Sequence, residues 1–271
     1  MHLQEQTRSL GIPTHYFLEV PDYKNPENPN FHHLALIEGL ERGNISSVLF
    51  GQVVDPAFML SIRNRGIPTV YFGQMTGDYG SVFLDFPGMI FEGLKAFRQM
   101  GCRRVGLITA IFERNLSGVE PADGYNRDYF ERVHQLGLDT DPRLVCDSQG
   151  VDIREILEKS FYQRGADYVD SILKEFGRED YPDGLLITDD VLASGVLDRL
   201  NVVWPRWREE LKVMTHSNEG SPIISHYNPY IIRLEIEIGK IASRMISLLQ
   251  GIKSGNERPE PELLLPHVIG L

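Results

Sequence analysis

The chain has 271 residues, of which 42% are hydrophobic and 24% are charged, and its formal net charge is −11. This length allows two modest domains or one large one, and the acidic balance argues against a surface that binds DNA or an anionic membrane. No apolar run approaches the ~18 residues that span a bilayer, and the polar start "MHLQEQTRSL" lacks the apolar core of a signal peptide, so we expect a cytoplasmic protein.

Two stretches near the amino end are almost identical: residues 11–17 read "GIPTHYF" and residues 66–72 read "GIPTVYF". In each copy a Gly follows a polar, helix-compatible run, and a Pro two residues later prevents the helix from continuing. The β-branched and aromatic residues that come next favour a buried strand. Each copy therefore predicts the end of a helix followed by the start of a strand. Two such junctions indicate repeating βα units. The alternative is coincidence, because short Gly-Pro junctions recur in α/β proteins.

Apolar runs and helical patterns alternate along the rest of the chain. Asp55 and Pro56 suit the cap and the first turn of the helix that precedes the second copy. We expect strands in residues 46–51, 103–110, 184–190 and 211–217, and helices in residues 87–100, 152–177 and 235–252. Such alternation predicts an α/β fold with parallel sheets that helices cover on both faces. Ligands of such folds bind at the carboxyl ends of the strands.

The first strand end of interest is "ITDDVLASGVLDRL", residues 187–200. Asp189 or Asp190 precedes a helical run, so one of them should accept a backbone N–H as the helix cap. Capping alone would explain both residues, because a carboxylate also favours the positive end of the helix dipole. The sharper hypothesis is that one carboxylate caps the helix while the other accepts hydroxyl groups of a ligand.

A polar loop follows the strand expected at residues 103–110 and leads into an aromatic-rich amphipathic helix. Phe112, Glu113 and Asn115 lie where such a loop would face a ligand. An ordinary solvated loop would have the same composition, so ligand binding and simple solvation are both open for these residues.

His216, Ser217 and Asn218 directly follow another expected strand, and a buried structural histidine is the main alternative to a ligand contact there. Phe161 and Arg164, in "KSFYQRGADY", could supply an aromatic platform and a hydrogen-bonding fork. Helix packing and a solvated arginine would account for the same two residues.

Several signatures of catalysis and cofactor binding are missing from the sequence. It has no G-x-S-x-G elbow, P-loop, G-x-G-x-x-G or H-E-x-x-H motif. His32 and His33 make a poor metal pair, because adjacent residues on a helix point apart. The two cysteines, Cys102 and Cys146, are too few for a disulfide framework. We therefore expect no catalytic residues, no metal and no cofactor.

The order of these segments resembles the effector-binding domain of the lactose-repressor (LacI/GalR) family of bacterial transcription regulators. The matching segments are "RRVGLITA", "ADGYNRDYF", "PDGLLITDDVLASGVLDRL", "LKVMTHSN" and "IEIGKIASRMISLLQGI". The most specific match is "LITDDVLASG", in which Asp190, Ala193 and Gly195 stand at the offsets of the family's Asp and Ala-x-Gly. Asp85, in "SVFLDF", lies at a recurrent acidic position of the family.

The resemblance implies two Rossmann-like subdomains of the periplasmic-binding-protein-like type I, with a ligand cleft between them. It implies a first subdomain of residues 1–110 with about 219–234, and a second of residues 111–218 with about 235–271. It also implies a sensor that binds a small polar metabolite, with a sugar or sugar derivative as the family default. Such a sensor forms a homodimer and contacts DNA only through a helix-turn-helix domain that is absent from this chain.

The sequence departs from the family where ligand anchors are common. Pro121 stands three residues before Gly124, where the family often has an Arg. The other departures are Ser217-Asn218 in place of an acidic residue and Arg233-Leu234 in place of Gln-Pro. The resemblance therefore predicts the architecture more closely than it predicts the ligand.

Two other functions stay open. A free-standing solute-binding protein of a transport system would share the fold but would need export. An enzyme could use Asp189, Asp190 and His216 as acid–base groups, although it would also need a perturbed pKa and a nucleophile or water in reach.

The repeat also predicts that the first subdomain is short of one strand. If "GIPTVYF" follows a helix and enters a strand, "GIPTHYF" should do the same after the short helix in "HLQEQTRSL". The strand before that helix would lie ahead of Met1, and in a doubly wound sheet such a strand is interior. We therefore expect a longer natural chain. We also expect the apolar stretch "FMLSI", residues 58–62, to lie on a helix face that pairs two copies.

Overall fold

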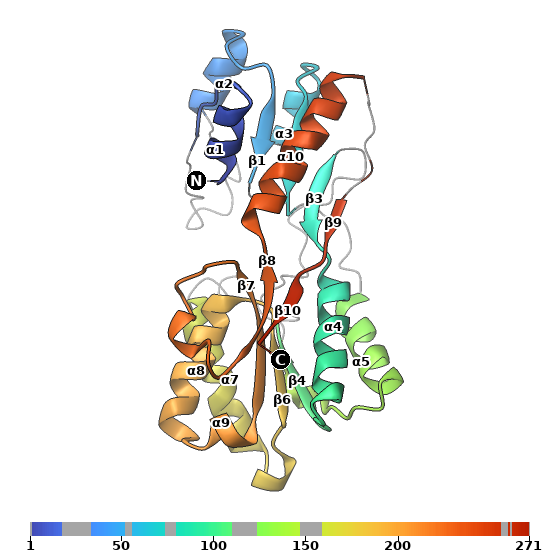
Figure 1. Cartoon of the computed structure of the whole chain (residues 1–271), viewed down its shortest axis with the longest axis vertical. Coiled ribbons are helices and arrows are strands. Elements are labelled where there is room, and N and C mark those ends of the chain that lie inside the picture. The colour runs from blue at the N-terminus through green and yellow to red at the C-terminus, as the bar shows by residue number, and fades with distance from the viewer. Residues whose placement is uncertain are drawn as a thin grey trace. The chain divides into compact units, whose positions relative to one another are not determined.

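The computed structural model describes residues 2–17, 34–51, 56–73, 80–109, 124–146, 159–255, 260 and 262–270 (Figure 1). The chain divides into two compact units. Unit 1 consists of Met1–Leu84 and Glu237–Leu264, and unit 2 consists of Asp85–Ile236 and Leu265–Leu271. The predicted α/β class, with parallel sheets flanked by helices, is confirmed in both units.

Unit 1 has a four-stranded parallel sheet in the order β1-β2-β3-β9. Its elements are α1 (His2–Ser9), α2 (Leu34–Glu41), β1 (Val48–Phe50), α3 (Pro56–Arg63), β2 (Thr69–Phe72), β3 (Ser81–Leu84), α10 (Ile238–Lys253) and β9 (Glu262–Leu264). Tyr71 of β2 is fully buried in an apolar cluster with side chains of α2 and α3. The neighbouring Val70 points to the opposite face, where α10 contacts β2 and β3. Helices therefore cover both faces of this sheet.

Unit 2 has a six-stranded sheet in the order β10-β8-β7-β6-β4-β5, in which only β10 runs antiparallel to its neighbour. Its strands are β4 (Val105–Ile108), β5 (Val145–Cys146), β6 (Gly184–Ile187), β7 (Lys212–Asn218), β8 (Ile232–Ile236) and β10 (His267–Ile269). Its α-helices are α4 (Phe86–Gln99), α5 (Gly124–Gln135), α7 (Phe161–Glu175), α8 (Asp190–Val203) and α9 (Trp207–Glu210).

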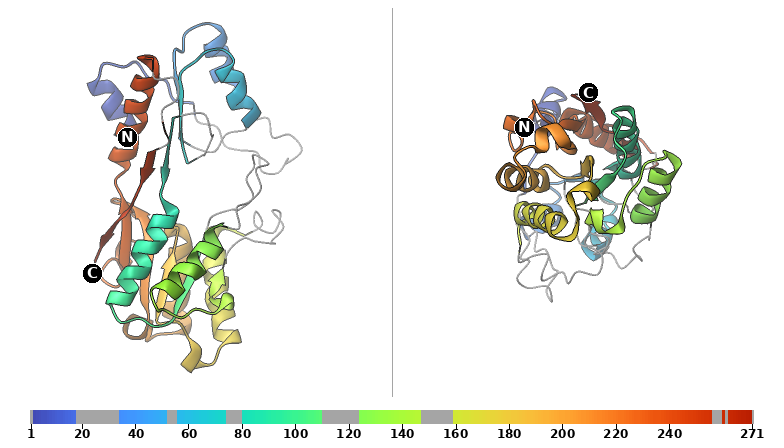
Figure 2. Two further views of the ribbon diagram at one scale, coloured as in Figure 1. Left: turned by 90° about the vertical axis from the view of Figure 1, so that its right-hand side faces the viewer. Right: turned by 90° about the horizontal axis from the view of Figure 1, so that it is seen from below.

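The two faces of the unit 2 sheet carry different helices. Leu186 of β6 packs with α4 and α5, whereas the adjacent Leu185 packs with α7 and α8. Seen from below in Figure 2, the two pairs of helices lie on opposite sides of the strands. The four helices thus leave the ends of the strands, rather than their faces, for a ligand.

The predicted boundaries, residues 1–110 with 219–234 and residues 111–218 with 235–271, are wrong. β4 lies between β5 and β6 in the sheet of unit 2, so this unit begins before residue 110. β8 extends the same sheet, while α10 packs on unit 1. An apolar run predicts a buried strand, but it does not predict which of two similar sheets contains that strand. For this reason both predicted boundaries between the units differ from those in the structure.

The helix end predicted for each copy of the repeat is confirmed, but the strand predicted for the first copy, "THYFLEV", is absent from residues 14–17, and its last three residues lie outside the described part of the chain. Gly11 and Gly66 follow α1 and α3 with positive φ of 67° and 70°. The second copy enters β2 as expected. Residues 14–17 form no strand, because a strand needs a backbone partner and β1 pairs only with β2 in the described part of the sheet.

Residues 58–62, "FMLSI", which were expected to contact a second copy, contribute buried side chains to the core of unit 1. Met59 and Ile62 are buried, and both belong to the apolar cluster that contains Tyr71. Met59 and Ile62 are therefore not available for a contact between two copies.

α7 and α8 approach each other at two glycines. A Cβ on Gly195 would lie 2.7 Å from the carbonyl carbon of Tyr162, and one on Gly165 would lie 3.1 Å from that of Leu192. The carbonyl oxygens would be closer still. Gly195, which the family resemblance singled out, is therefore needed for a structural reason: it lets α8 approach the backbone of the first turn of α7.

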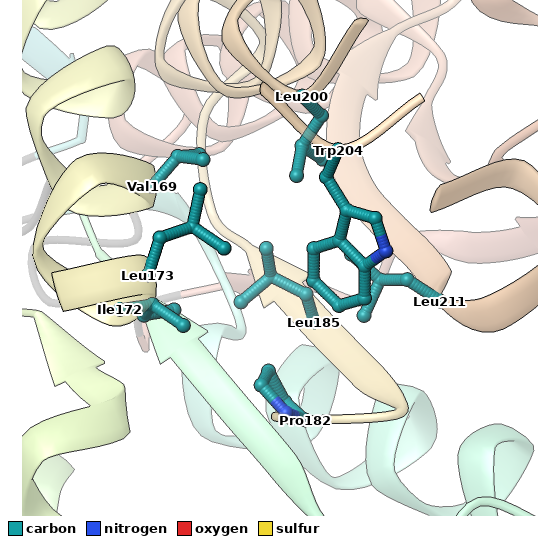
Figure 3. A pocket seen from close by; sticks show the side chains of 8 residues that line it. All are labelled: Val169, Ile172, Leu173, Pro182, Leu185, Leu200, Trp204 and Leu211. Carbon is teal, nitrogen blue, oxygen red and sulfur yellow. The ribbon is translucent and has the colours of Figure 1, made fainter. Parts of the chain in front are cut away.

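A small cavity of about 10 Å³ remains in the core of unit 2 (Figure 3). Apolar side chains of α7, β6 and α8 line it, among them Val169, Leu185 and Leu200, and the indole ring of Trp204 closes one side. An apolar void of this size is about the minimum for one water molecule and offers it no hydrogen bond. It is a packing defect rather than a ligand site.

We expect Val169→Ile to fill this cavity and to raise the free energy of unfolding by about 0.5–1 kcal/mol, since burial of one methylene contributes about 0.8 kcal/mol. Urea unfolding with an unchanged m value would measure the gain. Val202→Ile is the control, because Val202 is 69% exposed and the same methylene would stay in water. A loss of stability in Val169→Ile would show that the cavity cannot accept a methyl group.

Candidate functional site

Three neighbouring strands of unit 2, β4, β6 and β7, end at the same edge of the sheet. Thr109 and Thr188 directly follow β4 and β6, and in the register of the sheet His216, which lies within β7, is beside Thr188. They lie on the sheet face that carries α4 and α5, because Leu186 packs there two residues before Thr188. The hydroxyl group of Thr188 donates to that of Thr109 over 3.2 Å. The row places polar groups where ligands of parallel sheets bind.

Asp189 is the cap of α8. Its Oδ1 atom accepts the backbone N–H groups of Val191 and Leu192, both over 2.9 Å. Burial raises the pKa of Asp189, the backbone hydrogen bonds oppose this shift, and the neighbouring Asp190 carboxylate adds to it. The hypothesis that one of the two carboxylates caps the helix is confirmed for Asp189, which leaves Asp190 for another role.

Asp190 is the first residue of α8 and is partly buried. Its Oδ2 atom accepts a hydrogen bond from the hydroxyl group of Ser221 over 2.7 Å. This bond fixes the carboxylate at the helix end whose dipole favours a negative charge. No donor among the described residues reaches its Oδ1 atom, so this oxygen can accept a hydrogen bond from a ligand.

Two buried groups of β7 lack hydrogen-bond partners in the described part of the chain. They are the Nε2 atom of His216 and the hydroxyl group of Ser217. Burial lowers the pKa of His216, and the Asp190 carboxylate opposes the shift. The imidazole is therefore neutral near pH 7, and one nitrogen of a neutral imidazole accepts a hydrogen bond. Since a buried polar group without a partner is unfavourable, a ligand or water would supply what these groups lack.

We expect the chain to lose stability as the pH falls below about 6.5, the ordinary pKa of histidine. His216 has a lower pKa in the folded protein than in the unfolded chain. The unfolded chain therefore binds the additional proton, and acidification favours unfolding until the pH passes the folded pKa. His216→Gln should remove this part of the pH dependence.

Urea unfolding between about pH 5 and pH 8 would measure the effect. His15→Gln, which replaces an exposed histidine in the same way, is the matched control. The same pH profile in His216→Gln and in the unmodified chain would contradict the prediction.

The other predicted site residues lie in different places. The guanidinium group of Arg164 lies 5.7 Å from the ring centre of Phe161, in the first turn of α7. Gly165 holds that turn against the first turn of α8, so α7 brings these two residues close to the helix end that carries Asp190. Phe161 also packs partly against the core, as the helix-packing alternative expected. Asn218 is exposed at the end of β7. The predicted residues outside the described part of the chain are Phe112, Glu113 and Asn115, as well as Asp55, Pro121, His32 and His33.

Sequence reasoning missed Ser221 and the hydroxyl groups of Thr109 and Thr188. The signal for the threonines was present, because the three strands end in the similar runs "LIT", "LIT" and "VMT". In the third run, the threonine is one residue away from the position that aligns with Thr109 and Thr188. Thr215 pairs with Ile187 and faces the other side of the sheet, so His216 takes the place of a third threonine.

In the part of the chain that the structure describes, no helix is long and apolar enough to cross a membrane. The described residues also bring no three His, Cys, Asp or Glu side chains together as a possible metal site. The groups that they do bring together at the strand ends are a carboxylate, hydroxyl groups and an imidazole.

The sequence matches the periplasmic binding protein-like domain family over residues 94–270. No curated protein matches it. Among solved structures, the fold is similar to that of a regulatory protein of the LacI family from Chloroflexus aggregans, with a TM-score of 0.72 and 15% identity over 99% of this chain and 88% of that one.

Two further similar structures hold sugars. One is the complex of the transcriptional regulator CelR with cellobiose, with a TM-score of 0.67 and 19% identity over 89% of this chain and 69% of that one. The other is a LacI family regulator, CCPA from Weissella paramesenteroides, with bound sucrose, a TM-score of 0.70 and 13% identity over 99% and 90% of the two chains. At these identities the likeness is one of fold.

Proposed function

Because this chain belongs to the periplasmic binding protein-like domain family, we propose that it binds a small polar metabolite as the effector-binding domain of a LacI-type transcription regulator. The sequence resemblance supports this, as does the fold shared with LacI-family regulators. The observation that carries the proposal is the Asp190 carboxylate, which Ser221 holds at the carboxyl edge of the unit 2 sheet with one oxygen left for a ligand. The proposed activity is binding and not catalysis.

The ligand that these groups suit is rich in hydroxyl groups. A ligand hydroxyl that donates to the Asp190 carboxylate forms a charge-assisted hydrogen bond, which is stronger than a neutral one. The neutral imidazole of His216 is a second acceptor, and hydroxyl groups of Thr and Ser both donate and accept. A sugar or sugar derivative has this chemistry, and two proteins of the same fold hold cellobiose and sucrose.

A thermal-shift screen against sugars, sugar acids and polyols, with cellobiose and sucrose included, tests the proposal. A ligand at a hundred times its Kd should add about 2.7 kcal/mol to the stability of the folded chain. For a protein of this size that corresponds to a rise in Tm of roughly 5–10 °C. The absence of a shift with every compound of these three classes would contradict a carbohydrate-like ligand.

We further propose that the chain forms a homodimer and that DNA is contacted through a separate helix-turn-helix domain. The family resemblance supports both proposals, and a symmetric two-fold contact is the commonest oligomer. The net charge of −11 gives the chain no electrostatic attraction to DNA. Sedimentation equilibrium at tens of micromolar should give twice the mass of one chain, and a monomer there would contradict the dimer.

A further inference from the structure

A second row of polar side chains lies at the carboxyl edge of the unit 2 sheet, on the face that carries α7 and α8. Ile187 of β6 packs on this face. The backbone is still extended at Asp189, so the Asp189 side chain points to the same face two residues later. Continued by two residues, the register of β6 and β7 puts Ser217 beside Asp189, and Ser217 is paired with Glu235 of β8. Two carboxylates and a hydroxyl group therefore share this edge with His216, which lies on the other face.

The chain neutralises one carboxylate of this edge and leaves two others without a cation. Glu235 is 5% exposed and forms an ion pair with Arg233. Asp189 and Asp190 are adjacent and both are partly buried. In the described part of the chain their carboxylates accept hydrogen bonds only from backbone N–H groups of α8 and from Ser221, and no Lys or Arg forms an ion pair with them. The edge thus keeps two negative charges that the described residues do not balance.

This arrangement is unfavourable in the absence of a cation. Like charges side by side repel each other, and partial burial removes water that would screen them. Both effects are visible at Asp189, where burial and the neighbouring Asp190 carboxylate raise the pKa of the carboxyl group. A bound positive charge would relieve the repulsion and replace part of the lost hydration.

The groups that lack partners at this edge are mainly acceptors. The second oxygen of Asp189 and the Oδ1 atom of Asp190 receive no hydrogen bond from the described residues. His216 lies close enough for the Asp190 charge to act on its pKa, and its neutral imidazole offers one acceptor nitrogen. The hydroxyl group of Ser217, which is 1% exposed and has no partner in the described part of the chain, can donate or accept. A ligand group that donates several hydrogen bonds and accepts none fits this set.

A metal ion is a poorer fit than an ammonium group. Calcium takes about six to eight oxygen ligands, and magnesium requires near-octahedral geometry. The described residues bring no third His, Cys, Asp or Glu side chain to Asp189 and Asp190 as a possible metal site. A protonated amino group has three donors and no acceptor, so two carboxylate oxygens and one neutral acceptor satisfy it.

We propose that the ligand of this site carries a protonated amino group beside its hydroxyl groups, and that the amino group binds the Oδ1 atom of Asp190 next to the charge of Asp189. This rests on the proposed function, because it names the class of ligand for the same site: an amino sugar or an amino polyol. The two carboxylates would repel an anionic ligand such as a sugar acid, which is a means of rejecting the wrong compound.

Calorimetric titration with matched compounds tests the charge apart from the shape. Glucosamine, galactosamine and glucamine would be compared with glucose, galactose and sorbitol, with the N-acetyl derivatives, and with the sugar acids. At about pH 7 such amino groups are mostly protonated. We expect at least one amine to bind about tenfold or more tightly than its neutral and its acetylated counterparts, since both partners of the hydrogen bond are then charged.

The outcomes separate this proposal from the proposed function. If a neutral sugar binds as tightly as its amine, or a sugar acid binds more tightly, the amino group is overturned and a sugar sensor remains. If no compound binds, both fail. A rise in Tm with magnesium or calcium chloride alone that is lost in Asp190→Asn would assign the site to a metal ion and would also overturn the amino group.

Asp189→Asn tests the charge without a change of shape. Asn caps a helix about as well as Asp, so α8 should remain stable. The affinity for the amine should fall by about threefold or more, while the affinity for the neutral sugar should change less. Glu209→Gln is the matched control, because it removes one negative charge from an exposed side chain of α9, before β7 begins, and should leave both affinities as they are. Equal losses for amine and neutral sugar in Asp189→Asn would overturn the proposal.

Discussion

Replacement of Gly195 by Ala is expected to lower the free energy of unfolding by about 3 kcal/mol, the upper end of the usual range for an overpacked interior. The added methyl group would lie 2.7 Å from the carbonyl carbon of Tyr162 and 3.0 Å from its Cα atom. Both atoms belong to the backbone, so no side-chain rotation can make room. α7 and α8 would have to separate, which would loosen the apolar contacts of Leu192 and Val196 in the core of unit 2.

Gly251→Ala provides the matched control for this prediction. Gly251 also lies within a helix, but a Cβ at this position would meet no atom within 4 Å. Ala should therefore stabilise α10 by up to about 1 kcal/mol, the difference in helix propensity. Thermal and urea unfolding of both variants would separate the steric effect from propensity. A Gly195→Ala protein as stable as the unmodified chain would contradict the close approach of the two helices.

The second large effect is expected on ligand binding, from Asp190→Asn. Loss of a hydrogen bond to a charged group corresponds to about 1.5–3 kcal/mol, or roughly a 10- to 100-fold weaker Kd. Asn keeps an oxygen that can accept the hydroxyl group of Ser221, and Asp189 still caps α8. The stability of the chain should therefore change little. Calorimetric titration with the sugar found in the thermal-shift screen would measure the loss.

Asp189→Ala is the control, and it should have the opposite pattern: a loss of stability with a smaller effect on ligand affinity. It removes the cap of α8 and should lower the free energy of unfolding by about 1 kcal/mol. Its effect on ligand affinity should be smaller than that of Asp190→Asn, because Asp189 uses its oxygen on the backbone. If Asp190→Asn binds the ligand as tightly as the unmodified chain, Asp190 has only its structural bond to Ser221.

The elements of unit 2 could be predicted from sequence where an apolar run or helical periodicity ends at a capping or turn residue. β6 is an apolar run that stops at two aspartates, and α8 starts there with a cap. β9 and β10 were not predicted, because three residues each are too few for a periodicity. They become strands only through their neighbours, β3 and β8.

The failure at residues 14–17 has the same physical cause. Their composition favours a strand as much as that of β2 does, and the preceding turn is the same. Strand formation is a property of a pair, so propensity without a partner predicts only an extended segment. At the site, the residue types were predictable and their alignment was not. His216 lies beside Thr188 because of the register between β6 and β7. A register is a property of two paired strands and cannot be predicted from the sequence of one of them.

Unit 1 is built from two stretches that are far apart in the chain, and this sets the order in which a ribosome can complete the two units. After Leu84, synthesis continues for about 150 residues before α10 appears, which takes roughly 8–30 s at about 5–20 residues per second. During that interval α10 does not yet cover Val70 and Val82, and by its end five of the six strands of unit 2 have been made. The side chain of Gln6 donates to the carbonyl group of Gly239 over 2.9 Å, so this hydrogen bond can form only after almost the whole chain has been synthesised. The nascent protein therefore exposes an apolar sheet face for seconds, which is the state that chaperones bind and in which misassembly begins.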